Sequence, residues 1–300
     1  NYPRGSMLKR RISELSKNEV EKAVDLHRKA TIVNALDTVP LYDYEKLNYP
    51  SRMKEGGCTC VNVGAVGTES FFAQSMKDLC EWHKTLEKYS DHMMQATSTA
   101  DIREAKRIGK VAVIFGTQNT RCIEDNTAFL KIFHKLGFRI FQLTYQQKNL
   151  VGDGCGERRD SGLSRKFGHS VVSEMNRLGI LIDLSHVGPV TSMEAIDLSK
   201  DPVAITHTGV YAIAGTVRTQ KDDIIKALAE KGGVMGQGAF SLLVKKNPAI
   251  TRPTVEDFLD HIDYVANLVG VDHIGLGLDI AEDRPMELWE RRMRTDPELR

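Results

Sequence analysis

Two histidines and an aspartate stand at the ends of short apolar runs in the second half of the sequence. His186 and His207 follow two successive runs, and Asp279 ends a later one. Neutral imidazoles are good ligands for Zn²⁺, and a carboxylate beside a metal-activated water can carry its proton. Either histidine alone would more simply be a buried, hydrogen-bonded residue. Both together, with Asp279, favour a metal-hydrolase site.

These residues can meet only if the apolar runs are strands of one sheet. Eight runs rich in valine and isoleucine recur, and several are apolar on both faces, as in a parallel sheet that is covered on both sides. The expected strands are Thr31–Ala35, Cys58–Ala65, Val111–Gly116, Arg139–Tyr145, Ile180–Ser185, Val203–Thr208, Gly233–Ala239 and His273–Asp279.

Amphipathic stretches separate the expected strands. Ser16 and Glu19 have the spacing of a helix-capping box, and Gly137 and Gly179 each stand between a helical pattern and the next strand. Eight repeated units of this kind most simply form an α/β fold, a single (β/α)8 TIM barrel. The competing fold is an open, doubly wound sheet, but no Gly-x-Gly-x-x-Gly pattern follows the first run.

Function in such a barrel gathers at the carboxyl ends of the strands. Besides the two histidines, Gln118 follows the third expected strand and Tyr145 ends the fourth. The stretch Gln146–Lys166 is longer than ordinary loops, which indicates a functional loop over the site.

The composition is that of an ordinary globular protein. The 300 residues include 41 basic and 40 acidic side chains, a balance that offers no electrostatic basis for binding nucleic acid or an anionic membrane. No apolar run is long enough to span a bilayer. Five cysteines, an odd number, argue against a disulfide framework and favour a cytoplasmic location. Residues 1–6 resemble a tag remnant, which leaves 7–300 as one barrel domain.

The remaining histidines are expected to have no part in the site. His273 opens the last strand, at the end of the barrel away from catalysis, and is predicted to be structural. The others fall on helical patterns and are expected to be solvated or capping residues at the surface: His27, His83, His92, His134, His169 and His261.

Longer ordered motifs then point to a family. The sequence closely resembles the membrane (renal) dipeptidase family, peptidase family M19, among the amidohydrolase-like barrels. The matching segments are Gln142–Tyr145, Asn149–Gly154, Gly162–Ser164, Phe167–Gly168, Glu174–Gly179, Asp183–Val187 and Gly275–Asp279, together with His207, Arg218 and Asp222.

The resemblance implies a role for each matching residue. His186 and His207 match the two histidine ligands of one metal, and Asp279 matches the aspartate that handles the proton. Arg218 matches an arginine that holds the substrate's free carboxylate. Tyr145 stands where typical members have a histidine that steadies the tetrahedral intermediate, and a phenol can also donate a hydrogen bond to an oxyanion. Asn149 is also expected to contact the substrate.

The first half of the family's metal site departs from the pattern. Typical members end the first strand with His-x-Asp, but this chain has Asn34-Ala-Leu-Asp-Thr38, in which only Asp37 could serve as a ligand, and only with a shifted alignment. Gln118 replaces the glutamate that bridges two metals. A neutral amide supplies no charge to such a bridge. We therefore expect at most one Zn²⁺, held by His186 and His207 with weak help from Gln118 or Asp279.

The sequence-based hypothesis is a metal-dependent hydrolase that cleaves dipeptides or similar small amides with a metal-bound water. Two alternatives stay open: a barrel with an altered amide or lactam substrate, and a catalytically inactive small-molecule-binding homologue without metal. Because family members often pair, the resemblance also implies a homodimer. Family members continue beyond the strand that ends at Asp279, so Met286–Arg300 is interpreted as the beginning of a C-terminal segment that is otherwise missing.

Overall fold

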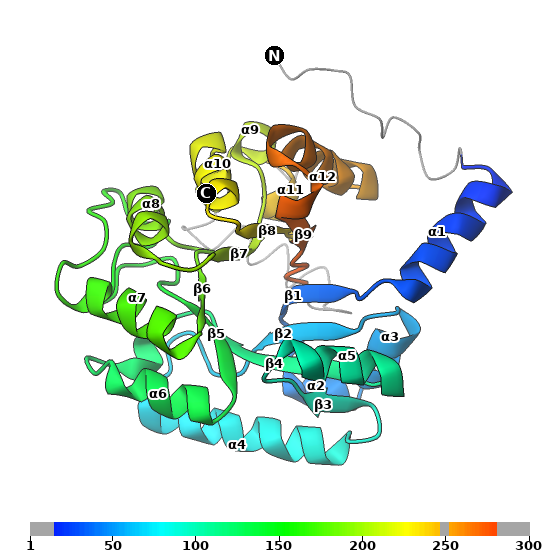
Figure 1. Ribbon diagram of the computed structural model, residues 1–300, viewed down its shortest axis with the longest axis horizontal. Coiled ribbons are helices and arrows are strands. Elements are labelled where there is room, and N and C mark those ends of the chain that lie inside the picture. The colour runs from blue at the N-terminus through cyan, green and yellow to red at the C-terminus, as the bar shows by residue number, and fades with distance from the viewer. Residues whose placement is uncertain (1–14, 247–251, 281–300) are drawn as a thin grey trace.

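The computed structural model describes residues 15–246 and 252–280, and its centre is a parallel sheet of nine strands (Figure 1). The expected tag remnant at residues 1–6 and the segment Met286–Arg300 lie outside the described residues. The strands are β1 Val33–Asp37, β2 Cys60–Gly64, β3 Met93–Gln95, β4 Val111–Thr117, β5 Phe138–Gln142, β6 Leu181–Asp183, β7 Ala204–Thr208, β8 Val234–Gln237 and β9 Ile274–Leu276.

Eight of these strands form a closed ring. The pairing runs from β2 through β1, β9, β8, β7, β6 and β5 to β4, and β4 pairs with β2 to close it. The predicted (β/α)8 barrel is confirmed, with all eight expected strands present within a few residues of their predicted bounds. The short β3 was not predicted. It pairs with the first half of β4, at Val111–Val113, whereas β5 pairs with the second half.

Helices connect the strands and surround the ring (Figure 1). They are α1 Lys17–Lys29, α2 Leu41–Tyr44, α3 Tyr49–Glu55, α4 Phe72–Lys88, α5 Thr99–Ile108, α6 Ala128–Lys135, α7 Phe167–Leu178, α8 Pro189–Leu198, α9 Tyr211–Ala214, α10 Asp222–Glu230, α11 Ser241–Val244 and α12 Val255–Val269. The predicted capping box of Ser16 and Glu19 begins α1. Gly137 and Gly179 follow α6 and α7 with positive φ, as glycines after helices commonly do. None of the helices in the described ranges has the length and apolarity needed to cross a lipid bilayer.

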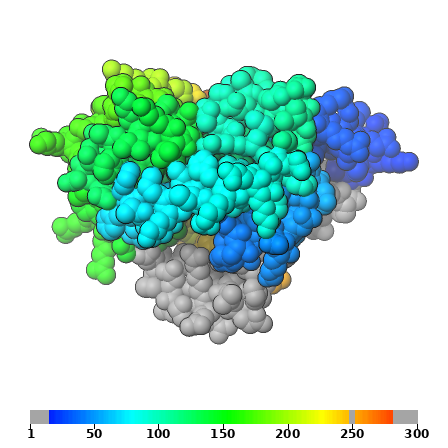
Figure 2. All heavy atoms as spheres, turned by 90° about the horizontal axis from the view of Figure 1, so that it is seen from below, coloured from blue at the N-terminus to red at the C-terminus, as the bar shows by residue number. Residues whose placement is uncertain are grey.

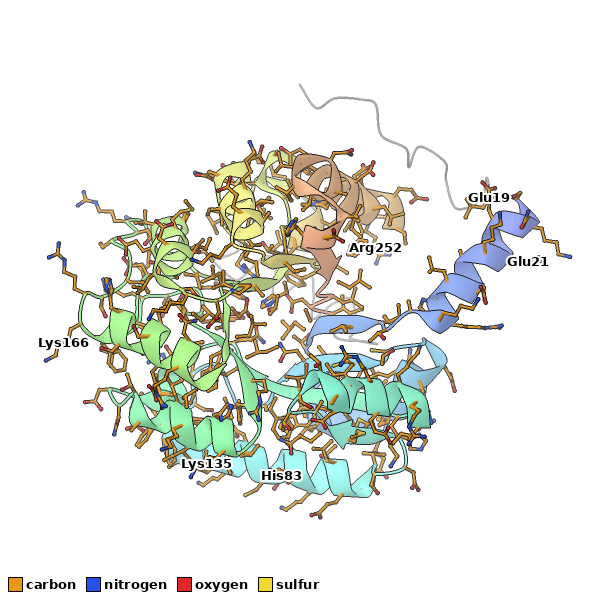
Figure 3. The ribbon with its side chains drawn as sticks, in the orientation of Figure 1. Glu19, Glu21, His83, Lys135, Lys166 and Arg252 are labelled. Carbon is orange, nitrogen blue, oxygen red and sulfur yellow. The ribbon has the colours of Figure 1, made fainter. Side chains whose placement is uncertain are left out.

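The core lies between the strands and the outer helices. Phe133 of α6 packs edge-on against Phe138 and Phe141 of β5, with ring centroids 5.0 and 5.7 Å apart. All three rings are buried. Each such aromatic pair stabilises the fold by about 0.5–1.5 kcal/mol beyond the contribution of the area that it buries. Figure 2 shows α4 and α5 lying across one face of the molecule. Figure 3 shows His83 of α4 and Lys135 of α6 on the outer side of the molecule.

One histidine prediction was wrong. His261 of α12 is fully buried, although its helical pattern indicated a surface position. Its Nδ1 accepts a hydrogen bond of 2.9 Å from the backbone N–H of Val210, and its Nε2 lies 3.0 Å from the carbonyl oxygen of Val244. The ring therefore joins α12 to the segments around α9 and α11. His273 is structural, as predicted, with its Nδ1 2.8 Å from the carbonyl oxygen of Gly233.

Candidate active site

Three rings that the sequence singled out lie in one row at the carboxyl ends of β5, β6 and β7. Tyr145 stacks on His186 with ring centroids 4.1 Å apart and an angle of 26° between the planes. The ring of His186 lies 4.9 Å from that of His207. Both imidazoles are buried and Tyr145 is half-buried. The barrel thus brings together the two predicted nitrogen ligands and the phenol predicted beside them.

Two of the predicted site residues have a backbone conformation that ordinary side chains avoid. His186 has φ +59° and Asp279 has φ +51°, among only four non-glycine residues with positive φ in the described chain. Such conformations cost of order 1–3 kcal/mol each and cluster at functional sites. At His186 the conformation is held by neighbours, since its carbonyl oxygen accepts a 2.7 Å hydrogen bond from the N–H of Cys155.

This strain gives a testable prediction. We expect His186→Gly to be more stable to unfolding than His186→Ala by about 1 kcal/mol, because glycine adopts positive φ without a Cβ clash. Urea titration of the two variants measures the difference. His169→Gly and His169→Ala form the matched control on helix α7, where alanine should be the more stable by about 1 kcal/mol. Equal stability of the two His186 variants would contradict the assignment of strain.

His207 is completely buried, and one of its ring nitrogens is already engaged. Nδ1 lies 2.8 Å from the hydroxyl oxygen of Thr206. Nε2 is buried and has no hydrogen-bond partner among the described residues. Burial, and then the nearby positive charge of Arg218, hold the pKa of His207 well below its ordinary value, so the ring is neutral. A neutral imidazole with an uncommitted nitrogen is the form that binds a metal ion.

Arg218 lies beside His207 in the segment between α9 and α10. Its side chain is buried, and Nη2 is 3.5 Å from the carbonyl oxygen of His207. Nη1 is buried without a hydrogen-bond partner in the part of the chain that the structure describes. A buried guanidinium with unused donors is costly unless an anion completes it. Its planar fork suits a carboxylate.

Asp279 follows β9, which is separated from β7 by β8 alone. Its backbone N–H donates to the carbonyl oxygen of Leu36, 3.2 Å away, and the preceding N–H of Leu278 donates to Asn34 Oδ1 at 2.9 Å. Asp279 is half-buried. The backbone at Asp279, the residue predicted to carry the proton, is therefore held by residues at the end of β1. The same segment differs from the pattern of the family that the sequence resembles.

The two weaker metal-ligand predictions have different surroundings. Gln118 is half-buried at the end of β4, and its side-chain nitrogen lies over Gly64 at the end of β2. Asp37 is engaged elsewhere, because its Oδ1 accepts a 2.8 Å hydrogen bond from the hydroxyl of Tyr49, on α3. Burial, and then the negative charge of Asp37, raise the pKa of the Tyr44 hydroxyl well above its ordinary value, and the ring of Tyr44 lies 5.2 Å from that of Tyr49. The structure therefore places the Asp37 carboxylate with the tyrosines of α2 and α3.

Asn149 serves the long loop rather than an open site. Its amide nitrogen lies 2.8–3.0 Å from Asn119 Oδ1, Thr120 Oγ1 and the Leu143 carbonyl, and its oxygen accepts from two backbone N–H groups. An asparagine amide has two N–H donors, so none is left for a substrate. The expected functional loop, residues 146–166, does reach the site, because Gly154 pairs with Val187 next to His186.

Three buried polar residues beside the row of rings were not given a role from sequence. Gln142 and Gln237 are fully buried, and the side-chain oxygen of each lacks a hydrogen-bond partner within the described ranges. Asp183 pairs in register with Gln142 on the neighbouring strand. Polar side chains at the carboxyl ends of barrel strands are the available sequence signal, but their hydrogen bonds depend on the closed barrel.

The donors present fit one metal ion and do not fit two. The unused Nε2 of His207 and the second imidazole, 4.9 Å away between ring centroids, would suit one ion as nitrogen ligands. Among residues 15–246 and 252–280, no three His, Cys, Asp or Glu side chains gather as a metal site. Catalytic zinc commonly has three protein ligands, so a neutral ligand such as Gln118 would have to complete the set.

Comparison with known proteins finds a matching family profile and relatives that are named dipeptidases. The sequence profile described as Membrane dipeptidase (Peptidase family M19) matches residues 23–290. Dipeptidase tcpJ of Claviceps purpurea is 34% identical over 198 residues, which are 65% of this chain and 46% of that protein. Dipeptidase verJ of Clonostachys rogersoniana is 31% identical over 199 residues, 66% of this chain and 50% of that protein. The chain thus spans about half the length of these curated relatives.

A solved structure resembles almost the whole barrel. The crystal structure of an amidohydrolase from Pseudomonas aeruginosa is 36% identical, covers 89% of this chain and 79% of its own, and superposes with a TM-score of 0.81. The likeness therefore extends over both halves of the barrel.

Proposed function

The chain belongs to the membrane dipeptidase family, peptidase family M19, and from this premise we propose that it is a metal-dependent hydrolase cleaving the amide bond of dipeptides or similar small amides. The observation that carries the proposal is the buried pair His186 and His207 beside Arg218, whose unused donors suit an anionic substrate. The dipeptidase names of two relatives support the substrate class.

Each residue of the site has a separate task in this proposal. His186 and His207 would hold a single Zn²⁺, with Gln118 as a weak further ligand. A bound zinc ion supplies Lewis acidity, which polarises the amide carbonyl and lowers the pKa of water. Asp279 takes the proton of the attacking water and delivers it to the leaving amine. Tyr145 donates a hydrogen bond to the oxygen that becomes negative.

Arg218 determines which small amides bind. A guanidinium next to His207 can hold the free carboxylate of a dipeptide while the amide bond lies over the imidazoles. The positive charge is buried, so its interaction with a carboxylate is only weakly screened by salt. We therefore expect dipeptides with a free C-terminus to be better substrates than their amidated counterparts.

We expect Arg218→Ala to raise KM for dipeptides by about 10–100-fold, since a hydrogen bond to a charged group contributes about 1.5–3 kcal/mol. Steady-state kinetics with zinc-loaded protein measures this, on a dipeptide and on its C-terminal amide. Amidation of the dipeptide should raise the KM of the unmodified protein by a similar factor. It should leave the KM of Arg218→Ala almost unchanged. Arg177→Ala, on the exposed side of α7, is the matched control. An equal preference for the free carboxylate in Arg218→Ala would contradict the assignment.

A further inference from the structure

Behind His207 lies a buried carboxylate that has no role in the proposed reaction. Asp183, at the end of β6, is fully buried and accepts four hydrogen bonds. Its Oδ1 accepts from the N–H of Ser185, the hydroxyl of Ser185 and the N–H of Thr206, at 2.8–2.9 Å. Its Oδ2 accepts from the hydroxyl of Thr206 at 2.6 Å.

The hydroxyl of Thr206 connects this carboxylate to the ring of His207. It has one hydrogen to give and has two strong acceptors within reach, Asp183 Oδ2 at 2.6 Å and His207 Nδ1 at 2.8 Å. A distance of 2.5–2.7 Å is typical of a hydroxyl that donates to a carboxylate. The Thr206 oxygen therefore accepts from His207, so the ring hydrogen of His207 is on Nδ1.

The backbone around this chain of hydrogen bonds leaves little freedom. The N–H of His207 donates to Ser185 Oγ at 3.0 Å, which fixes the strand against β6. On the other side, a Cβ at Gly236 or at Gly277 would run into the carbonyl oxygen of Thr206. The backbone of Thr206 is thus enclosed between β6 and the two glycines.

We propose that Asp183 and Thr206 are positioning residues that hold His207 as the Nδ1–H tautomer and so present the lone pair of Nε2 to the site. This inference rests on the proposed function, because His207 needs a free lone pair on Nε2 in order to bind a metal ion. The tautomer itself is a property of the metal-free chain. Outer partners of this kind commonly determine which nitrogen of a ligating histidine is free.

His261 provides a reference inside the same molecule. Its Nδ1 must accept, because a backbone N–H can only donate, so its hydrogen is on Nε2 and points to the Val244 carbonyl. The two fully buried histidines, His207 and His261, are thus expected to be neutral and to have opposite tautomers. Of these two, His207 has the less common Nδ1–H form, which it shares with the half-buried His273, whose Nδ1 donates to the Gly233 carbonyl.

The test is NMR of the full chain with ¹⁵N-labelled histidine rings, after zinc has been removed with a chelator. The unmodified protein should show two rings with the hydrogen on Nδ1, those of His207 and the half-buried His273, and only the His207 signal should disappear in His207→Gln. In Asp183→Asn, the amide oxygen should occupy the position of Oδ1, because the backbone N–H groups of Ser185 and Thr206 donate there and need an acceptor. The amide nitrogen then occupies the position of Oδ2 and donates to the hydroxyl of Thr206. Thr206 must then donate to His207, and the tautomer should invert while His261 stays unchanged.

Thr206 variants keep the proposal falsifiable if Asp183→Asn does not fold. Thr206→Val replaces the hydroxyl by a methyl group of similar size and should remove the preference for Nδ1–H, and Thr206→Ser should restore it. Zinc affinity, measured by competition with a chromogenic chelator, should fall about 10–100-fold in Asp183→Asn and Thr206→Val but not in Thr206→Ser.

The outcomes separate this inference from the proposed function. A hydrogen on Nε2 of His207 in the unmodified protein, or an unchanged tautomer in Asp183→Asn, would overturn the positioning role. If the tautomers behave as expected and the unmodified protein binds no zinc, the positioning role stands and the metal-dependent hydrolase fails.

Discussion

Replacement of His207 by alanine is expected to remove zinc binding and amide hydrolysis together. His207 would provide one of the two imidazole ligands, and its Nε2 is buried without a hydrogen-bond partner among the described residues. With two strong ligands at most, the site has no reserve, since catalytic zinc sites usually have three. Loss of an outer partner alone costs about 10–100-fold in affinity, so loss of the ligand should cost more than about 100-fold.

Elemental analysis after dialysis, together with initial rates on a dipeptide, measures the effect of His207→Ala. His169→Ala, on the exposed side of α7, is the matched control and should keep both the metal and the activity. Thermal unfolding of both variants shows whether the barrel is intact. Unchanged zinc uptake in a folded His207→Ala protein would mean that the metal lies elsewhere.

Asp279→Asn is expected to lower kcat by about 10²–10⁴-fold while it changes KM and zinc content little. The carboxylate is needed to take a proton from water and return it to the amine, and an amide can do neither. The backbone should accept the change, because asparagine tolerates the positive φ that Asp279 has.

Steady-state kinetics with zinc-saturated Asp279→Asn measures the effect. Asp272→Asn, an exposed neighbour in the 3₁₀ turn before β9, is the matched control. A fall in zinc content equal to the fall in rate would assign Asp279 to metal binding instead of proton transfer. An unchanged kcat would remove it from the reaction.

The strands could be predicted from sequence because a doubly covered parallel strand needs apolar side chains on both faces. Val111–Phe115, the main part of β4, carries that signal in full. The three residues Met93–Gln95 do not, since they are few and contain no β-branched side chain. Their pairing with β4 comes from the barrel, not from local preference.

Part of the candidate site could be predicted from the sequence, because a barrel brings the carboxyl ends of its strands together. His186, His207 and Tyr145 meet for that reason. What could not be predicted depends on tertiary contacts: the positive φ of His186, and the hydrogen bonds by which the Asn149 amide joins the loop to Asn119, Thr120 and Leu143.

Two further residues show how local patterns mislead. The role of Asp37 as a metal ligand depended on the alignment of the first strand, and a shift of one residue moves a side chain to the opposite face of a strand. The structure places it against Tyr49, outside the row of imidazoles. His261 was expected at the surface because histidine is common on exposed helix faces, but its two ring nitrogens match two backbone groups of neighbouring segments. Such pairing has no signature within the helix itself.

The central claim is that His186 and His207 hold one catalytic zinc ion although the first half of the family's metal site is replaced. The most direct test is the zinc content of the purified chain after dialysis, and again after incubation with Zn²⁺ and removal of the excess. We expect about one ion per chain after loading, with two imidazole ligands visible by X-ray absorption spectroscopy. No retained zinc after loading, or two ions per chain, would contradict the claim.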